Sequence, residues 1–144
     1  MTRTTSRVVP DTNVVVSSVL RPESVPGKAL SYAITHDQII ASTASLAELT
    51  EVLRRPKFSR ALALAEIEFH LDRLTAIFEV VEAVHTVSDC VDLKDNMILE
   101  LALSGRADII ISGDDHLLRL HPWRGILILK PADYLALKAG DDLP

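Results

Sequence analysis

Residues Asp108-Ile109-Ile110-Ile111-Ser112-Gly113-Asp114 decide the fold class of this chain, because they place an acid just after a short apolar run. An apolar run of this length between polar residues is typical of a buried strand. The same arrangement opens the chain, where Arg7-Val8-Val9-Pro10 is followed by Asp11. Both stretches therefore predict a strand that leads directly into an aspartate.

The rest of the chain alternates strand signals with helix signals. Strands are expected at 8–9, 38–41, 79–81, 108–111 and 125–129. Helices are expected at 14–20, 28–35, from the hydroxyl residues 42–45 to 54, at 61–78 and 95–103, and from 131 onward. This alternation predicts an α/β fold, a three-layer α/β/α sandwich with a mostly parallel sheet of about five strands. No repeat or linker divides the chain, so a single domain over residues 1–144 is expected.

Prolines and glycines set the expected helix limits. Pro22, Pro26 and Gly27 are expected to break the chain before the second helix, and Pro56 is expected to stop the third. Pro131 suits the first position of the closing helix, where its missing N–H costs nothing.

The composition excludes several classes of function. Hydrophobic residues make up 48% of the 144 positions, which indicates a folded protein. Aromatic residues make up only 4%, so base stacking on an aromatic platform is not expected. The net charge of −5 argues against avid, non-specific coating of nucleic acid. It is compatible with a nuclease, which needs an acidic pocket and only a local basic rim.

The single cysteine, Cys90, excludes an internal disulfide framework and suits a reducing compartment. No uninterrupted apolar segment is long enough to span a bilayer, and the first residues contain no apolar signal-peptide core. A cytoplasmic protein without a membrane segment is therefore expected.

The candidate site consists of acids that follow predicted strands or lie near predicted helix starts: Asp11, Glu48, Asp95 and Asp114. In an open α/β sheet, ligands bind beyond the carboxyl ends of the strands, so these acids are expected to converge. Carboxylates in one pocket repel each other unless a cation compensates them. Magnesium and manganese accept oxygen ligands, so the pattern predicts a Mg²⁺ or Mn²⁺ site.

Taken singly, each acid also has a structural explanation. Asp11 is a favourable N-cap, and Glu48 reads as a solvated helix residue. Asp92 and Asp95 suit the cap and first turn of one helix, where negative charge is favourable. Ser112 to Asp115 suits a turn. Their joint placement is what favours a site.

The order and wording of the segments resemble the PIN-domain family, and within it the toxins of bacterial toxin–antitoxin systems, the VapC-like ribonucleases. The resemblance rests on Val9-Pro10-Asp11-Thr12-Asn13-Val14, Ser45-Leu46-Ala47-Glu48-Leu49, Asp92-Leu93-Lys94-Asp95-Asn96 and Ile111-Ser112-Gly113-Asp114. It extends to the stretches 51–58 and 129–135, and so covers nearly the whole chain.

This resemblance implies a magnesium- or manganese-dependent endoribonuclease with a catalytic quartet of Asp11, Glu48, Asp95 and Asp114. Asp11, Asp95 and Asp114 are expected to hold the metal, and Glu48 to orient the attacking water or accept its proton. The supporting residues are expected to be Asn13, Ser112, Asp92 and Asp115. The sequence departs from the family at His116, where related chains often carry a further acid, and a second metal position is therefore in doubt.

The family resemblance also implies partners: an RNA substrate, a small antitoxin that blocks the site, and a second copy in a homodimer. The expected substrate contacts are Lys94, Arg54, Arg55 and Lys57, with Arg60 in the same basic cluster and Arg119 and Arg124 as possible extensions. A solvated helix end explains the basic cluster slightly better than an RNA contact does. Cys90 is expected to be a packing residue.

Two other functions fit parts of the pattern. A phosphoryl-accepting receiver domain also has clustered acids and a parallel sheet, and Lys130-Pro131 after the last strand suits it. However, this chain has one acid instead of two after its first strand, and no acceptor aspartate after its third. A PIN fold without catalysis, acting as a binding module, is the other alternative.

Overall fold

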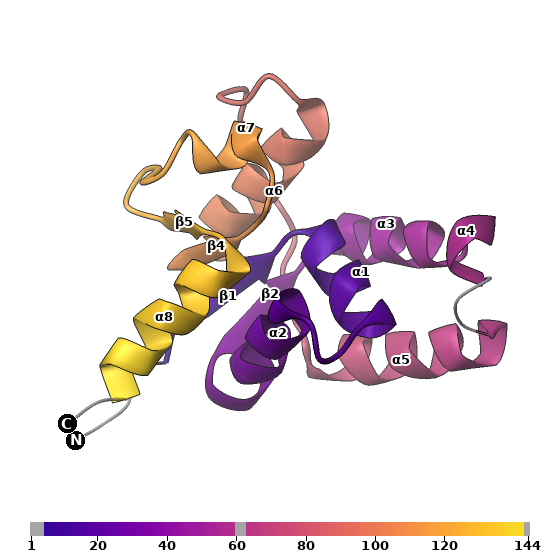
Figure 1. The fold of residues 1–144 in the computed structure, drawn as a ribbon. Coiled ribbons are helices and arrows are strands. Elements are labelled where there is room, and N and C mark those ends of the chain that lie inside the picture. Colours follow the sequence, from indigo (N-terminus) through magenta and orange to yellow (C-terminus); the bar gives the residue numbers. More distant parts are fainter. Residues whose placement is uncertain (1–4, 60–62, 143–144) are drawn as a thin grey trace.

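The centre of the fold is a sheet of five strands that all run parallel, as a computed structural model describing residues 5–59 and 63–142 shows (Figure 1). The strands are Arg7–Pro10 (β1), Gln38–Ala41 (β2), Glu79–Val80 (β3), Ile109–Ile111 (β4) and Leu127–Leu129 (β5). Their spatial order is β3-β2-β1-β4-β5. The predicted α/β fold with a parallel sheet is confirmed.

Eight helices surround the sheet in the described part of the chain. They are Thr12–Leu20 (α1), Val25–His36 (α2), Thr43–Leu53 (α3), Pro56–Ser59 (α4), Leu64–Ile77 (α5), Leu93–Ser104 (α6), Asp115–Leu118 (α7) and Pro131–Asp142 (α8). The helices α1, α2, α3, α5 and α8 contribute to one core, and α6 and α7 to the other. This is the predicted three-layer arrangement (Figure 1).

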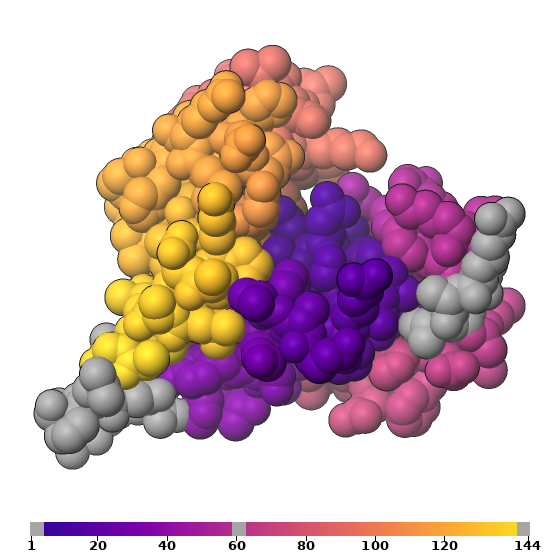
Figure 2. All heavy atoms as spheres, in the orientation of Figure 1, coloured from indigo at the N-terminus to yellow at the C-terminus, as the bar shows by residue number. Residues whose placement is uncertain are grey.

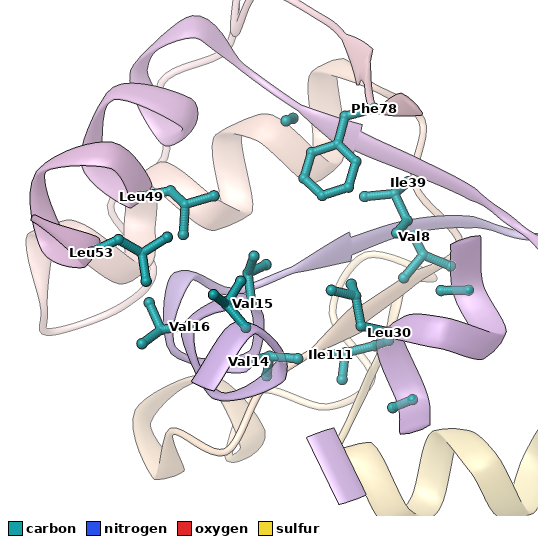
Figure 3. Packing of buried hydrophobic residues seen from close by; sticks show 14 of the residues in the cluster. Val8, Val14, Val15, Val16, Leu30, Ile39, Leu49, Leu53, Phe78 and Ile111 are labelled. Atoms are coloured by element: carbon teal, nitrogen blue, oxygen red, sulfur yellow. The ribbon is translucent and has the colours of Figure 1, made fainter. Parts of the chain in front are cut away.

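The strands divide their side chains between these two cores. Val8 packs on the α1 side of the sheet, and Val9 packs on the α6 side. In β4, Ile109 and Ile111 likewise join the first core, and Ile110 joins the second. Successive strand side chains point to opposite faces, so an apolar run without alternation requires helices on both faces. Figure 3 shows the first core, where the valines of α1 meet residues of the strands and of α2 and α3.

β1 is the strand at which the connectivity changes direction. It pairs with β2 on one side and with β4 on the other, with Val8 opposite both Ile39 and Ile109. The chain therefore leaves β1 toward one edge of the sheet and later returns to its other side. In an open parallel sheet such a switch point leaves a crevice beyond the carboxyl ends of the strands, where ligands bind.

The second helix begins earlier than its sequence predicts. Ser24 caps α2 by accepting a hydrogen bond from Gly27 N at 3.2 Å, so Pro26 and Gly27 lie inside the first turn. Proline is tolerated there because the N–H it lacks would be unpaired. A Cβ on Gly27 would lie 2.3 Å from Pro22 O, so only glycine fits. The prediction that these residues break the chain before the helix is therefore wrong.

Two short helices were not predicted. Pro56 does not follow the end of α3 as a simple stop but begins α4, and Asp114 caps α7 instead of leading into a plain turn. α6 begins at Leu93, two residues before the expected start, because Asp92 is its N-cap and accepts a hydrogen bond from Lys94 N at 2.9 Å. The interpretation of Asp92 as a cap and Asp95 as a first-turn acid is confirmed.

A buried polar cluster, which we call the Asp37 clasp, joins α8 to the amino-terminal ends of β1 and β2. Its members are Ser6, Asp37, Tyr134 and Lys138. Lys138 Nζ lies 3.2 Å from Asp37 Oδ1 and 2.7 Å from Ser6 Oγ, and the Tyr134 hydroxyl donates to Asp37 Oδ2 at 2.5 Å. The side chains of Lys138 and Asp37 are 2% and 0% exposed, so this ion pair is shielded from solvent.

Part of the expected long helix at 61–78 lies outside the described residues, as does Arg60; within the described part, α5 runs from Leu64 to Ile77. None of the helices in the described ranges has the length and apolar content that crossing a membrane requires.

Candidate active site

Asp11 lies at the centre of the crevice, at the carboxyl end of β1. Its backbone N–H donates to Ile111 O at 2.9 Å, which places it beside the end of β4. Its Oδ1 accepts from Val14 N at 2.9 Å, and its Oδ2 accepts from the Ser112 hydroxyl. The residue is 8% exposed. Burial raises the pKa of Asp11; the bonds from Ser112 and Val14 oppose this rise, and the charges of Asp114 and Glu48 add to it.

Ser112 joins two of the predicted acids. It follows β4 and is fully buried. While its hydroxyl donates to Asp11, its oxygen accepts from Asp114 N at 3.0 Å. Asp114 in turn caps α7 by accepting from His116 N at 2.8 Å through Oδ1. The turn after β4 therefore fixes Asp114 next to Asp11 across the switch point.

Asp95 reaches the same crevice from the first turn of α6 and is 7% exposed. Its Oδ2 accepts a hydrogen bond from the Cys90 thiol at 3.8 Å. A thiol is a weak donor and compensates little of the carboxylate charge. Burial, followed by the charges of Asp114 and Asp92, raises the pKa of Asp95 to about 6.

Asn96 holds Cys90 in place over Asp95. Its Oδ1 accepts from Cys90 N at 2.8 Å, and its Nδ2 donates to Cys90 O at 2.9 Å. Burial is the main reason why the pKa of the Cys90 thiol is raised, so this thiol stays protonated. The packing role predicted for Cys90 agrees with its burial, whereas the function of Asn96 was not predicted, because its partner lies in irregular chain.

Glu48 enters the crevice from α3 and bonds to the first residue of α1. The Thr12 hydroxyl donates to Glu48 Oε2 at 3.0 Å. Sequence reasoning missed Thr12, since nothing in the segment Asp11-Thr12-Asn13 indicates a contact with a helix 36 residues away. Thr12 thereby fixes a carboxylate that is otherwise on a long, mobile side chain.

These acids open into a cleft of about 240 Å³. The residues that line it are Asp11, Thr12, Asn13, Glu48, Val52, Arg55, Lys57, Phe58, Asp92, Lys94, Asp95, Ile98 and Asp114. Figure 2 shows a notch on this side of the molecule, between the salmon and orange surface of α6 and α7 and the magenta surface of α3 and α4. All four acids of the predicted quartet lie in this cleft.

In the described part of the chain, no lysine or arginine compensates the quartet, since no ion pair joins such a residue to Asp11, Glu48, Asp95 or Asp114. Two of these carboxylates, Asp11 and Asp95, are buried, and burial together with the charges of neighbouring acids raises their pKa values. A divalent cation is the partner that relieves such repulsion, and oxygen ligands of this kind suit Mg²⁺ or Mn²⁺.

The predicted basic contacts divide into two groups. Arg55, Lys57 and Lys94 line the cleft with exposed side chains. Arg54 points elsewhere, since its guanidinium donates to Glu68 Oε1 of α5 at 2.6 and 2.9 Å. Arg124 lies against Trp123 and pairs with Asp89 at 3.2 Å, and the cleft lining does not include it.

The predicted supporting residues also divide into those at the cleft and one outside it. Asn13 and Asp92 line the cleft, and Ser112 lies beneath it, whereas Asp115 is exposed and does not belong to the lining. His116 does approach the site. Its Nδ1 is 3.9 Å from Asp114 Oδ1, and it offers a ligand atom within 4.8 Å of those of Asp92 and Asp95.

Comparisons with known proteins agree with this geometry. The sequence model of the PIN domain matches residues 7–116. A chain in the crystal structure of VapBC2 from Rickettsia felis, bound to a DNA fragment from the promoter, superposes with a TM-score of 0.58 at 14% identity and covers 85% of this chain and 96% of its own length. The crystal structure of PAE2754 from Pyrobaculum aerophilum superposes with a TM-score of 0.57 at 15% identity, covering 94% and 96%. At these identities the likeness concerns the fold. No curated protein matches the sequence.

Proposed function

Because this chain belongs to the PIN-domain family, we propose that it is an endoribonuclease that hydrolyses phosphodiester bonds of RNA with Mg²⁺ or Mn²⁺. The observation that carries the proposal is the meeting of Asp11, Glu48, Asp95 and Asp114 in one cleft without a lysine or arginine partner among the described residues. Membership of this family sets aside the receiver-domain alternative.

The residues fit a metal ion by their chemistry. Asp11, Asp95 and Asp114 would hold it, since two of them are buried and the charge of the third raises the pKa of both. When bound, the cation lowers the pKa of a bound water and offsets negative charge on the phosphate in the transition state. Ser112 orients Asp11 and Asp114 for this purpose by bonding to both.

Glu48 is proposed to act on the attacking water. It is only half buried and lies at the cleft wall, and Thr12 holds one of its oxygens at 3.0 Å. Its second oxygen remains available to orient a water or accept its proton, the task of a general base. Thr12 is then a positioning residue that keeps this carboxylate aimed at the substrate.

Arg55, Lys57 and Lys94 are proposed to bind the RNA backbone. Lys57 lies in α4, with Arg55 just before that helix, and Lys94 lies in α6 on the other side of the cleft. A strand of RNA that crosses the acids therefore passes between them. Contacts to phosphates fix the position of a nucleic acid without reading its sequence. With a net charge of −5, the protein depends on these few local cations for RNA binding.

A toxin role with an antitoxin partner is the finer part of the proposal. It rests on the likeness in fold to VapBC2, a toxin–antitoxin pair. A largely apolar groove of about 450 Å³ between α1, α2 and α5 offers a surface for such a partner, with Ile34 and Ile77 partly exposed along it. A homodimer and a cytoplasmic location, where the RNA substrate is found, complete the proposal.

The decisive experiment compares the purified wild type with Asp11→Asn on mixed single-stranded and structured RNAs, in Mg²⁺, Mn²⁺ or chelator. Asp133→Asn, a loss of the same charge at an exposed position on α8, is the control. Cuts that require metal and Asp11 but not Asp133 support the proposal. Metal binding without cleavage of any RNA supports the alternative, a PIN-fold binding module. For the toxin role, expression of the wild type in bacteria is expected to arrest growth, and Asp11→Asn to remove the arrest.

A further inference from the structure

One side of the cleft changes from acidic to apolar and basic along α3 and α4. Glu48 is followed four residues later by Val52, and residues at this spacing lie on the same face of a helix. Arg55 N then donates to Val52 O at 3.1 Å, and Phe58 N donates to Arg55 O at 2.9 Å. These bonds continue a three-residue spacing beyond the end of α3, so the three residues follow Glu48 in one row along the cleft.

The opposite side of the cleft makes the same change within one turn of α6. Asp95 and Ile98 are three residues apart on this helix, and both line the cleft. The Cβ atoms of residues at this spacing lie about 5–6 Å apart. The apolar end of the cleft, which we define as Val52, Phe58 and Ile98, therefore begins one helical turn from an acid on each side.

Phe58 carries the one aromatic ring among the described residues that line the cleft. Val52 and Ile98 are 8% and 7% exposed and belong to the two cores, so they form a floor. Phe58 is only partly buried, because it packs against the first core and also lines the cleft. A ring above an apolar floor can receive a flat group with apolar faces, such as a nucleobase.

Two cations lie beside this ring. Lys57 Nζ is 4.9 Å from the centroid of the Phe58 ring, and Arg55 precedes Phe58 in the row. Both basic side chains are exposed, and the cation–π contact of an exposed lysine is weak. Lys57 can therefore leave the ring for a phosphate while a base stacks in its place. The ring, the cations and the acids together match a base, a backbone phosphate and the reacting phosphate of one RNA strand.

We propose that Phe58, above the floor of Val52 and Ile98, stacks against one nucleobase next to the scissile phosphate, and that the substrate must therefore present an unpaired nucleotide there. The inference rests on the proposed nuclease function for the reaction, whereas base binding is measured without cleavage. Proteins bind single-stranded RNA through bases that stack on aromatic rings, and a paired base stays stacked within its duplex. Because every base has a π face, one ring selects for an unpaired base and tolerates any sequence.

The test measures RNA binding by fluorescence anisotropy in the inactive Asp11→Asn protein. The probes are a short single-stranded RNA, a strand of the same length and charge without bases, and the same RNA paired with its complement. The variants are Phe58→Leu, which keeps an apolar side chain without the ring, and Phe58→Trp, which keeps a ring. Phe69→Leu is the control, because Phe69 is 57% exposed on α5 and does not line the cleft.

The Asp11→Asn protein is expected to bind the strand with bases about tenfold to a hundredfold more tightly than the strand without them, the range that the stacking of one base provides. Adding Phe58→Leu should make the two affinities nearly equal. Adding Phe58→Trp or Phe69→Leu should keep the preference. Affinity for the paired RNA should be the same in all of these proteins.

Equal affinity of the Asp11→Asn protein for strands with and without bases would overturn the inference, and this comparison needs no change at Phe58. A preference that persists in folded Phe58→Leu, as thermal unfolding checks, would overturn it too. So would a failure to bind any of the probes, which would assign the apolar end to a side chain of a protein partner.

The wild type separates this inference from the nuclease function. A preference for bases that depends on Phe58, without cleavage of any RNA by the wild type, would leave base binding standing and reject the nuclease function. Cleavage by the wild type without a preference for bases would do the reverse.

Discussion

The hydroxyl of Ser112 donates a hydrogen bond to Asp11 Oδ2, and its oxygen accepts one from the backbone N–H of Asp114. One fully buried side chain thus connects acids from the ends of β1 and β4, strands that are neighbours in the sheet but about a hundred residues apart in sequence. The hydrogen bond to Asp11 also lowers the pKa of that carboxyl against the effect of burial.

Replacement of Ser112 by alanine is expected to shift the acidic limb of the cleavage pH profile to higher pH. Without the hydroxyl, the pKa of Asp11 rises further, and a higher pH is needed to ionise it. The change is also expected to lower the free energy of unfolding by about 1–3 kcal/mol, because Asp114 N loses its acceptor. Rates between pH 5 and 9 measure the first effect. Ser112→Thr, which keeps a hydroxyl, should retain the wild-type limb, and an unmoved limb in Ser112→Ala would reject the link.

Replacement of Asp95 by asparagine is expected to abolish cleavage and to stabilise the metal-free protein at neutral pH. The folded wild type binds a proton on Asp95 more tightly than the unfolded chain, since the pKa is raised from 3.8 to about 6. Its stability therefore falls as the pH rises through this range and stays lower above it. Asp95→Asn lacks this loss, so its free energy of unfolding should exceed that of the wild type by about 1–3 kcal/mol at pH 7.5.

Thermal unfolding in chelator between pH 4 and 8 measures this gain. Asp133→Asn removes one exposed charge and should leave the melting temperature nearly unchanged. A variant of Asp95 that is less stable than the wild type at pH 7.5 would assign the residue a structural role instead.

Addition of Mg²⁺ or Mn²⁺ is expected to make the wild type more stable than Asp95→Asn, the reverse of their order in chelator. A ligand that binds only the folded state stabilises it by about 2.7 kcal/mol at a concentration a hundred times its Kd. The wild type should therefore melt at a higher temperature with cation, and chelator should restore the lower value. Asp95→Asn is expected to respond little, since it lacks one of the three carboxylates proposed to hold the cation. Equal stabilisation of both proteins by the cation would place the ion elsewhere.

Replacement of Thr12 by valine is expected to lower kcat by about tenfold to a hundredfold with little change in KM. A hydrogen bond to a charged group contributes about 1.5–3 kcal/mol, and here it orients the carboxylate of Glu48. Thr12→Ser keeps the hydroxyl and should recover most of the rate. A loss confined to KM would indicate that Thr12 contacts the substrate instead.

Replacement of Lys57 by alanine is expected to weaken RNA binding and to reduce its salt dependence. Loss of one phosphate contact lowers the slope of log Kd against log salt by about 0.7 for a single strand. Arg54→Ala is the matched control, because Arg54 lies three residues away but pairs with Glu68 outside the cleft. Both substitutions are made in the inactive Asp11→Asn protein, and fluorescence anisotropy measures its RNA affinity and the salt dependence of that affinity. Equal slopes for the two variants would remove Lys57 from the substrate path.

Replacement of Lys138 by methionine is expected to destabilise the protein by about 3–5 kcal/mol, because Asp37 would remain buried without its cation. Lys130→Met removes an exposed lysine just before the same helix and should have little effect. Denaturant unfolding measures the difference. Since the Asp37 clasp lies at the opposite end of the sheet from the cleft, kcat of the folded variant should equal that of the wild type.

The three layers of the fold and the meeting of the four acids in one cleft could be predicted from the sequence, because both depend on short-range signals. Apolar runs such as Ile109–Ile111 need helices on both faces wherever they lie, and an acid after such a run is carried to the sheet edge by the strand itself. Asp11 and Asp114 could therefore be placed together without knowledge of the tertiary contacts. Ser112 was implicated in the same way.

Other features depended on contacts that no local pattern encodes. The bond from Thr12 to Glu48 and the separation of Arg54 from Arg55 follow from how α3 packs against α1 and α5. The start of α2 was misplaced because a proline in a first turn resembles one in a break, and only the approach of Gly27 to Pro22 distinguishes them. The Asp37 clasp joins residues at both ends of the chain, and its members appear unremarkable in sequence.

The distribution of the acids over β1, α3, α6 and the turn after β4 has a consequence for the time at which the cleft forms during synthesis. The cleft contains residues from Asp11 to Asp114, and its side chains are held by strand pairing that includes β4. A ribosome that has not yet translated Asp114 therefore carries a nascent chain in which the four acids cannot assemble. The site is complete only after β4 and the turn that follows it have been synthesised.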